Sequence, residues 1–224
     1  MKGKFNYYWL LILIPLIFIV WFFLREKDNA PLRELPYFGP KKALKVNDTT
    51  YHSIPDFEFT NQYNEKVTKK TVAGKIYVTE YFFTTCQSIC PVMNTNLERV
   101  YKAFKNEPKF MILSHTVDPE IDSVAVLMDY AKLHGVTDKR WLFLTGEKPK
   151  LYEMARKGYV LNAEEGKGDS EDFIHTQNFA LLDDSGHIRG FYDGTDSLEI
   201  NRLIMEIKLL IQDHDHRLEI LHHP

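Results

Sequence analysis

KIYVTEYFFTTCQSICP, residues 75–91, decides the fold of this 224-residue chain. Its first nine residues are rich in aromatic and β-branched side chains, which favours a buried central strand. Pro91 then stands where a first helical position is favourable. The stretch therefore predicts a strand that runs directly into a helix, with both cysteines of the chain, Cys86 and Cys90, at the junction.

Similar signals on both sides of this junction predict an α/β domain. Strands alternate with helices and are followed by an antiparallel pair, which indicates a mixed sheet with helices on both faces. The first two strands form an added N-terminal β-hairpin. The strands are predicted at 54–60, 66–68, 75–83, 109–117, 141–144, 179–182 and 187–192, and the helices at 91–106, 122–134, 148–157 and 197–212.

The N-terminus predicts a membrane anchor. Residues 5–24 carry no charge, and 20 residues of helix span about 30 Å, the thickness of a bilayer's hydrocarbon core. A cleaved signal peptide is the alternative, but no small-residue cleavage site follows Leu24. A short N-terminal tail ahead of a large domain is the usual layout of a signal anchor, which predicts a single-pass protein with the domain outside the cytoplasm. No Ser-rich, Arg-rich amphipathic transit segment is found, so the expected location is a bacterial inner membrane, with the domain on the periplasmic side.

The remaining boundaries follow from composition. We predict an anchor at 1–27, a proline-rich linker at 28–48, a domain at 49–213 and a histidine-rich tail at 214–224. The tail is expected to be solvated and frayed, with weak metal capture as the alternative. A formal net charge of -3 gives no basic face for a phosphate backbone, so nucleic acid is not an expected partner.

The two cysteines are predicted to form a reactive dithiol. Four positions apart at a helix start, their sulfurs can share a metal ion or form a redox couple, and the helix dipole favours the thiolate. A structural disulfide would close only a small loop and is disfavoured. His175, at the end of a polar loop before a strand, is a candidate third ligand, although a lone histidine is more often packed or on the surface. Two sulfurs and one imidazole suit Cu(I), whereas structural zinc requires a fourth ligand.

Other polar residues receive structural roles. His115 lies within a predicted strand and is expected to be packed, not ligating. Asp118 and Asp122 are expected to cap the helix that follows them, with contact to a partner protein as the alternative.

Four motifs in order along the chain resemble the Sco/SenC family. They are residues 83–93 (FTTCQSICPVM), 117–122 (VDPEID), 141–146 (WLFLTG) and 172–176 (DFIHT). The resemblance implies a thioredoxin-like fold and a membrane-anchored copper chaperone for cytochrome c oxidase, with Cys86, Cys90 and His175 as copper ligands. Gln87 departs from the proline that many members carry after the first cysteine.

Two functions follow from these observations. The first is a metallochaperone, not an enzyme, that passes Cu(I) to the copper-site subunit of cytochrome c oxidase; binding of Cu(II) as well is left open. The second is a thiol:disulfide oxidoreductase that acts on the cysteines of that subunit or of other extracytoplasmic proteins, with thioredoxin-like reductants as partners. The spacing of three residues between the cysteines, and His175, favour the first. A peroxidase is disfavoured because no Thr-x-x-Cys segment with an arginine partner is found.

Overall fold

The computed structural model describes residues 34–45, 48–161 and 176–222. Seven strands form one mixed sheet in the order β4-β3-β7-β6-β5-β8-β9, and β5, β6 and β7 run parallel. The sheet strands are β3 (Glu58–Asn61), β4 (Lys66–Thr68), β5 (Ile76–Phe82), β6 (Phe110–Thr116), β7 (Trp141–Thr145), β8 (Asn178–Leu182) and β9 (Ile188–Asp193). The predicted thioredoxin-like mixed sheet is confirmed, as is the added hairpin, which is β3 with β4.

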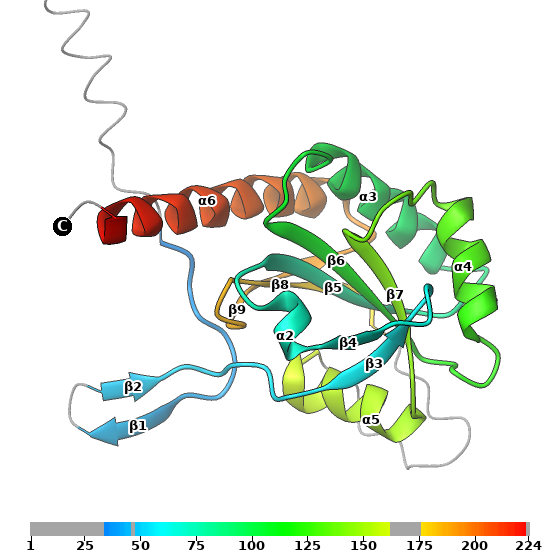
Figure 1. Cartoon of the computed structure of the whole chain (residues 1–224), viewed down its shortest axis with the longest axis horizontal. Coiled ribbons are helices and arrows are strands. Elements are labelled where there is room, and N and C mark those ends of the chain that lie inside the picture. Colours follow the sequence, from blue (N-terminus) through cyan, green and yellow to red (C-terminus); the bar gives the residue numbers. More distant parts are fainter. Residues whose placement is uncertain (1–33, 46–47, 162–175, 223–224) are drawn as a thin grey trace, which may run out of the picture. The chain divides into compact units, whose positions relative to one another are not determined.

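Helices cover both faces of this sheet, and Figure 1 shows α3 and α6 on one side and α5 on the other. The helices are α2 (Lys69–Val72), α3 (Cys90–Ala103), α4 (Val124–Leu133), α5 (Lys148–Glu153) with the π-helical turn η2 (Met154–Gly158), and α6 (Ser197–His222). None of the helices in these ranges combines the length and the apolar character that a bilayer crossing requires. The predicted span at 5–24 lies outside the described residues.

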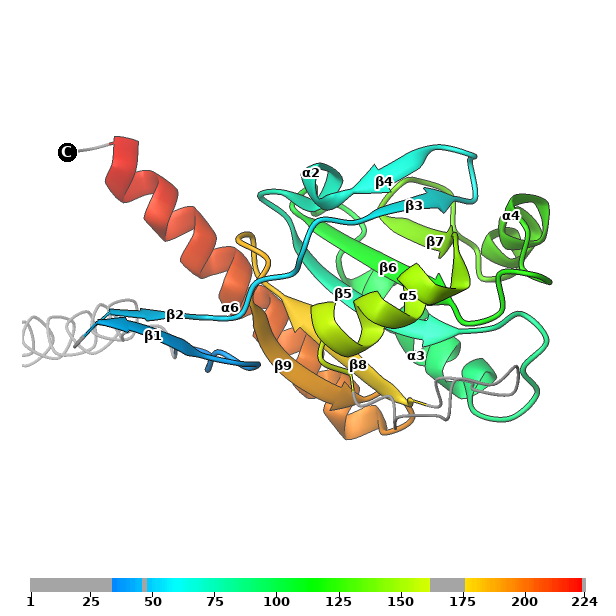
Figure 2. The same cartoon turned by 90° about the horizontal axis from the view of Figure 1, so that it is seen from below.

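The central strand β5 explains the two-layered core. All seven of its residues are buried, and their side chains alternate between the faces of the sheet. Val78 and Phe82 pack with α3, α4 and α6, whereas Tyr77 and Tyr81 pack with α5 and η2. Figure 2 shows β5, β6 and β7 side by side, with α5 in front of the sheet. Because β5 is covered on both faces, its carboxyl end is held in a fixed place.

The segment predicted as a linker contributes to the fold. Leu35 is 3% exposed and packs in the core, and the backbone N–H of Phe38 donates to the carbonyl of Ile188 at 2.9 Å. Arg189 donates to the carbonyls of Leu35 and Pro36 and forms a buried ion pair with Asp183 at 3.0 Å. The compact unit therefore begins at Leu35 and not near residue 49. Beyond these contacts, β1 (Lys42–Lys45) and β2 (Asp48–Thr50) form a separate two-stranded sheet.

The C-terminal helix is longer than predicted. We expected it to end near residue 212 and the tail to fray, but α6 continues to His222. Nδ1 of His214 lies 2.6 Å from Oδ2 of Asp184, and Arg217 pairs with the same carboxylate at 3.0 Å. Lys109 also pairs with Asp215. These long-range ion pairs hold residues that a frayed tail would leave in solvent.

Candidate metal centre

The cysteine loop, residues 83–89, joins the end of β5 to the start of α3. Phe82 ends the strand, and the backbone N–H of Cys86 donates to the carbonyl of Phe83 at 3.2 Å to close a turn. Cys90 is the first residue of α3, and Pro91 follows it in the first turn. The prediction that the cysteines stand at a strand-to-helix junction is thus confirmed.

Both cysteines are free thiols, and their surroundings differ. Cys90 is only 3% exposed and packs with the α3 side of the core, whereas Cys86 is partly exposed. The sulfur of Cys86 lies 3.6 Å from the hydroxyl oxygen of Ser88. The pair therefore presents one accessible sulfur and keeps the other inside.

The pKa values of the two thiols diverge accordingly. For Cys86, burial raises the pKa, but hydrogen bonds from Cys90 and Ser88 together outweigh it and lower the pKa to about 7. For Cys90, burial and the hydrogen bond to Cys86 raise the pKa to about 12. Thiolate, the form that binds soft metals and attacks disulfides, is therefore favoured at Cys86.

One buried carboxylate fixes the start of the cysteine loop. Asp122 is fully buried, and its oxygens lie 3.3 and 3.4 Å from the backbone N–H of Thr84, which donates to them. The hydroxyls of Thr84 and Thr116 also donate to this carboxylate. Asp122 does not cap α4 as we expected, because Ser123 is the N-cap and accepts from the N–H of Val126. The carboxylate instead ties the loop to the end of β6.

Polar residues line the interior next to the pair. Asn94, one helical turn after Cys90, donates to the hydroxyl of Tyr130 at 2.7 Å, and the Tyr130 ring stacks on Phe82. Glu80 on β5 is also fully buried. Burial raises the pKa of Glu80 to about 8, although a hydrogen bond from Ser114 at 2.7 Å opposes the shift. Glu80 is thus mostly a neutral acid at pH 7.

The structure describes only the sulfur half of the predicted ligand set. His175 lies outside the described residues, and within the described ranges no group of three or more His, Cys, Asp or Glu could hold a metal ion. Two thiols at a partly open site still fit a soft cation such as Cu(I), which accepts few ligands. His115 is fully buried on β6 with Nε2 3.1 Å from the hydroxyl of Tyr159, so its predicted packing role is confirmed.

Two residues near the loop were not predicted to belong to it. Asp122 was assigned to a helix cap because it stands close to the start of α4, two positions before Val124, and nothing in its spacing from Thr84 indicates their contact. Glu80 could have been noticed in the sequence, because it is an acid within a strand whose residues are all buried. A fully buried acid is rare unless it has a partner, so the sequence could have predicted an unusual environment for Glu80.

The fold and the loop define a thioredoxin-like α/β protein with two free thiols between a central strand and a helix. The SCO1/SenC family profile matches residues 46–212, and the chain belongs to this family. The SCO1 protein homolog of Bacillus subtilis is 26% identical over 166 residues, which are 73% of this chain and 86% of the relative.

Two solved structures are also similar. BsSco, a member of the Sco family of cytochrome c oxidase assembly proteins in which a disulfide switch was identified, is 27% identical with a TM-score of 0.61, over 71% of this chain and 93% of BsSco. Bradyrhizobium japonicum ScoI with copper bound is 22% identical with a TM-score of 0.57, over 71% of this chain and 99% of that chain. At that identity, the second likeness shows the shared fold.

Proposed function

We propose that this protein is a membrane-anchored copper chaperone that carries Cu(I) on Cys86, Cys90 and His175 and delivers it to the binuclear copper site of cytochrome c oxidase. The observation that carries the proposal is the free cysteine pair, with one sulfur accessible and one buried, at a junction fixed by β5 and Asp122. Membership of the SCO1/SenC family supports it, as do the copper bound to ScoI and the oxidase-assembly role of the family to which BsSco belongs.

The asymmetry of the pair suits metal transfer. An acceptor thiolate can approach the accessible Cys86 and replace it on the metal, while the buried Cys90 keeps its hold until the new bond has formed. Copper stays Cu(I) throughout such a ligand exchange, so no electron is needed. Oxidation of the pair to a disulfide removes two electrons and both thiolates, so only the reduced protein can carry the metal.

Anaerobic Cu(I) titration of the full chain against a competing chelator tests the ligand set. Cys86→Ser and Cys90→Ser are each expected to abolish stable binding, and His175→Ala to weaken it by at least tenfold. His216→Ala, on the exposed part of α6, is the matched control and is expected to bind as the unaltered protein does. X-ray absorption should detect two sulfurs and one nitrogen around the copper. Unchanged affinity in His175→Ala would refute the three-ligand site.

A thiol:disulfide oxidoreductase is the second candidate, and the unequal exposure of the two sulfurs favours it specifically. The Cys86 thiolate would attack a substrate disulfide and form a mixed disulfide, and Cys90 would then displace the second substrate thiol. The substrate gains two electrons, the pair becomes a disulfide, and a thioredoxin-like reductant must restore it. Cys90→Ser should trap the mixed disulfide, and His175→Ala should keep full reductase activity if this reaction is the primary one.

A further inference from the structure

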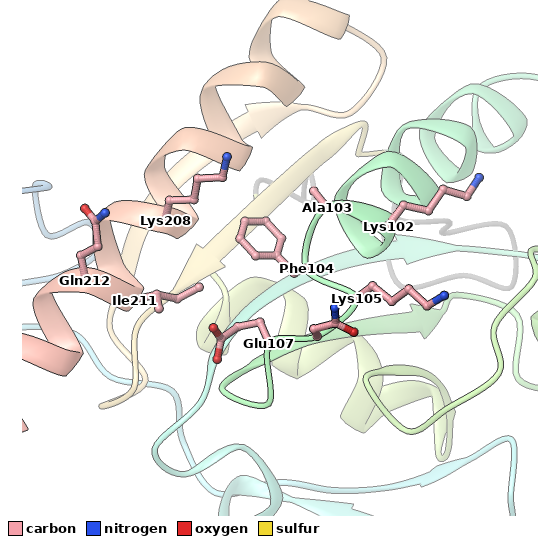
Figure 3. Close-up of a pocket in the computed structure, with 9 residues that line it drawn as sticks. Lys102, Ala103, Phe104, Lys105, Glu107, Lys208, Ile211 and Gln212 are labelled. Atoms are coloured by element: carbon pink, nitrogen blue, oxygen red, sulfur yellow. The ribbon is translucent and has the colours of Figure 1, made fainter.

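A hollow of about 430 Å³ lies between the C-terminal end of α3 and the middle of α6. Figure 3 shows the Phe104 ring between the two helices, with Lys102 and Lys105 on one side and Lys208 on the other. Phe104 is almost fully buried and Ile211 is half-buried, so the hollow combines an apolar floor with a cationic rim.

The rim carries more positive than negative charge, with three lysines and one glutamate among the lining residues. Lys102 pairs with Glu98 at 3.0 Å, but within the described ranges no ion pair joins Lys105 or Lys208, which are both exposed. Glu107 is the one acid among the lining residues. In a chain with a formal net charge of -3, this local excess of cations favours an anionic ligand with an apolar portion.

The hollow lies at the end of the sheet opposite the cysteines. The backbone N–H of Ile76, the first residue of β5, donates to the carbonyl of Lys109. Lys109 lies two positions after Glu107, which lines the hollow. The cysteine loop follows Phe82 at the other end of β5, six residues further on and therefore about 20 Å away. Across the sheet, Tyr77 pairs with Leu182 and Leu182 with Ile188. The carbonyl of Ile188 accepts from the backbone N–H of Phe38. The first residues of the compact unit therefore lie at the same end of the sheet as the hollow.

The N-terminal segment is long enough for this end of the compact unit to reach the membrane surface. Ten residues, 25–34, separate the predicted span from Leu35, and they can reach at most about 36 Å. The C-terminal part of α6 is held at this end by Asp184 and has exposed apolar side chains, Leu218 at 38% and Ile220 at 58%. Apolar and cationic side chains together are typical of surfaces that contact lipid.

We propose that this hollow binds the headgroup of an anionic phospholipid and so docks the domain on the membrane with the cysteine loop facing away. The inference rests on the membrane anchor of the proposed function. Lys105 and Lys208 contact the phosphate, and Phe104 and Ile211 lie beside the less polar part of the lipid. Docking in this orientation presents Cys86 to proteins that project from the same membrane.

Full-length protein in phospholipid nanodiscs tests this proposal. Individual lysines are acetylated with an uncharged reagent in discs of neutral phosphatidylcholine and in discs containing phosphatidylglycerol, and their rates are measured by mass spectrometry. Lys105 and Lys208 are expected to react at least fivefold more slowly in the anionic discs, and 0.5 M salt should remove most of this protection. Lys66 and Lys150, which are exposed and lie away from the hollow, are controls whose rates should not change.

The outcomes distinguish a lipid headgroup from a free phosphate compound as the ligand of the hollow. They also test lipid docking separately from the copper chaperone proposal. Equal rates in both discs, equal protection of Lys66 and Lys150, or failure of the chain to enter discs would overturn lipid docking. Protection by soluble glycerol phosphate in neutral discs would assign the hollow to a free phosphate compound and also overturn it. In anionic discs, a Lys105→Ser, Lys208→Ser variant should no longer dock, and Lys102 should therefore be acetylated faster than in the unaltered protein. In the control variant, Lys66→Ser, Lys150→Ser, the acetylation rate of Lys102 should not change. Cu(I) titration of the same variant tests the chaperone proposal independently.

Discussion

The Asp122 carboxylate accepts hydrogen bonds from the backbone N–H of Thr84 and from the hydroxyls of Thr84 and Thr116, and it is fully buried. All of these partners are donors. Because Thr84 lies two positions before Cys86, the carboxylate determines where the accessible sulfur stands relative to the buried one. Its role is positional: it contacts the loop through Thr84.

Asp122→Asn should therefore disturb the loop although it barely changes the volume. The new amide group faces donors with its own N–H groups, and leaving buried donors unsatisfied costs about 1–3 kcal/mol. We expect the free energy of unfolding to fall by about 2 kcal/mol and Cu(I) affinity to fall as well. Urea denaturation and chelator competition measure the two effects. Glu120→Gln, an exposed change in the same segment, is the control; equal behaviour of the two variants would contradict the assignment.

At the scale of elements, α6 shows how a helix can be extended by contacts that are distant in the sequence. Its last turns bind Asp184 in the turn between β8 and β9 through His214 and Arg217. Burial raises the pKa of Asp184, but hydrogen bonds and charge from His214 and Arg217 outweigh it and lower the pKa. The carboxylate is therefore ionised at neutral pH, where it holds the helix end.

Asp184→Asn should release this helix end without unfolding the domain. Amide hydrogen exchange over 213–222 is expected to rise by at least tenfold, while exchange in β5 and β6 stays as it was. The effect on global stability should be no more than about 1 kcal/mol because Arg217 is partly exposed. Asp129→Asn removes an exposed pair with Lys132 on α4 and serves as the control. Unchanged exchange over 213–222 would show that other contacts hold the helix.

Across the whole molecule, two fully buried groups titrate in opposite senses. Burial lowers the pKa of His115 to about 3, so between pH 3 and 6.5 the unfolded chain binds a proton that the folded protein does not. Stability linked to His115 therefore rises with pH in that window. Glu80 has a pKa of about 8 in the folded protein and near 4.5 when unfolded, so its contribution falls as pH rises from 4.5 to 8.

These opposite slopes should nearly cancel between pH 4.5 and 6.5 in the unaltered protein. Glu80→Gln is expected to leave the His115 slope exposed, about 1.4 kcal/mol per pH unit with stability rising, and His115→Phe to leave the opposite slope of Glu80. Urea denaturation of the reduced, metal-free protein at a series of pH values measures both. At each pH, the free energy of unfolding of the variant is subtracted from that of the unaltered protein, so that contributions from the other titrating residues cancel. Parallel pH profiles for all three proteins would show that neither group is perturbed as described.

Local patterns predicted most of the fold. The aromatic and β-branched run that forms β5 and the proline of α3 act over neighbouring residues, so the strand-to-helix junction and its cysteines could be predicted. Leu35 and Asp122 could not, because their partners are far away: Leu35 packs in the core from a proline-rich segment, and Asp122 binds a loop 38 positions earlier. The same reason explains the end of α6, whose polar sequence is typical of a tail until Asp184 is placed beside it.

The buried pair of Arg189 and Asp183 has a consequence for where the chain can be shortened. A protein cut at residue 49, the boundary that composition predicts, would lose the Leu35 and Pro36 carbonyls that accept from Arg189 and the segment that helps to bury its ion pair with Asp183. It would also remove the Leu35 side chain from the core. A soluble version intended for copper measurements must therefore retain Leu35 to Phe38, since instability from their loss would be mistaken for a defect in metal binding.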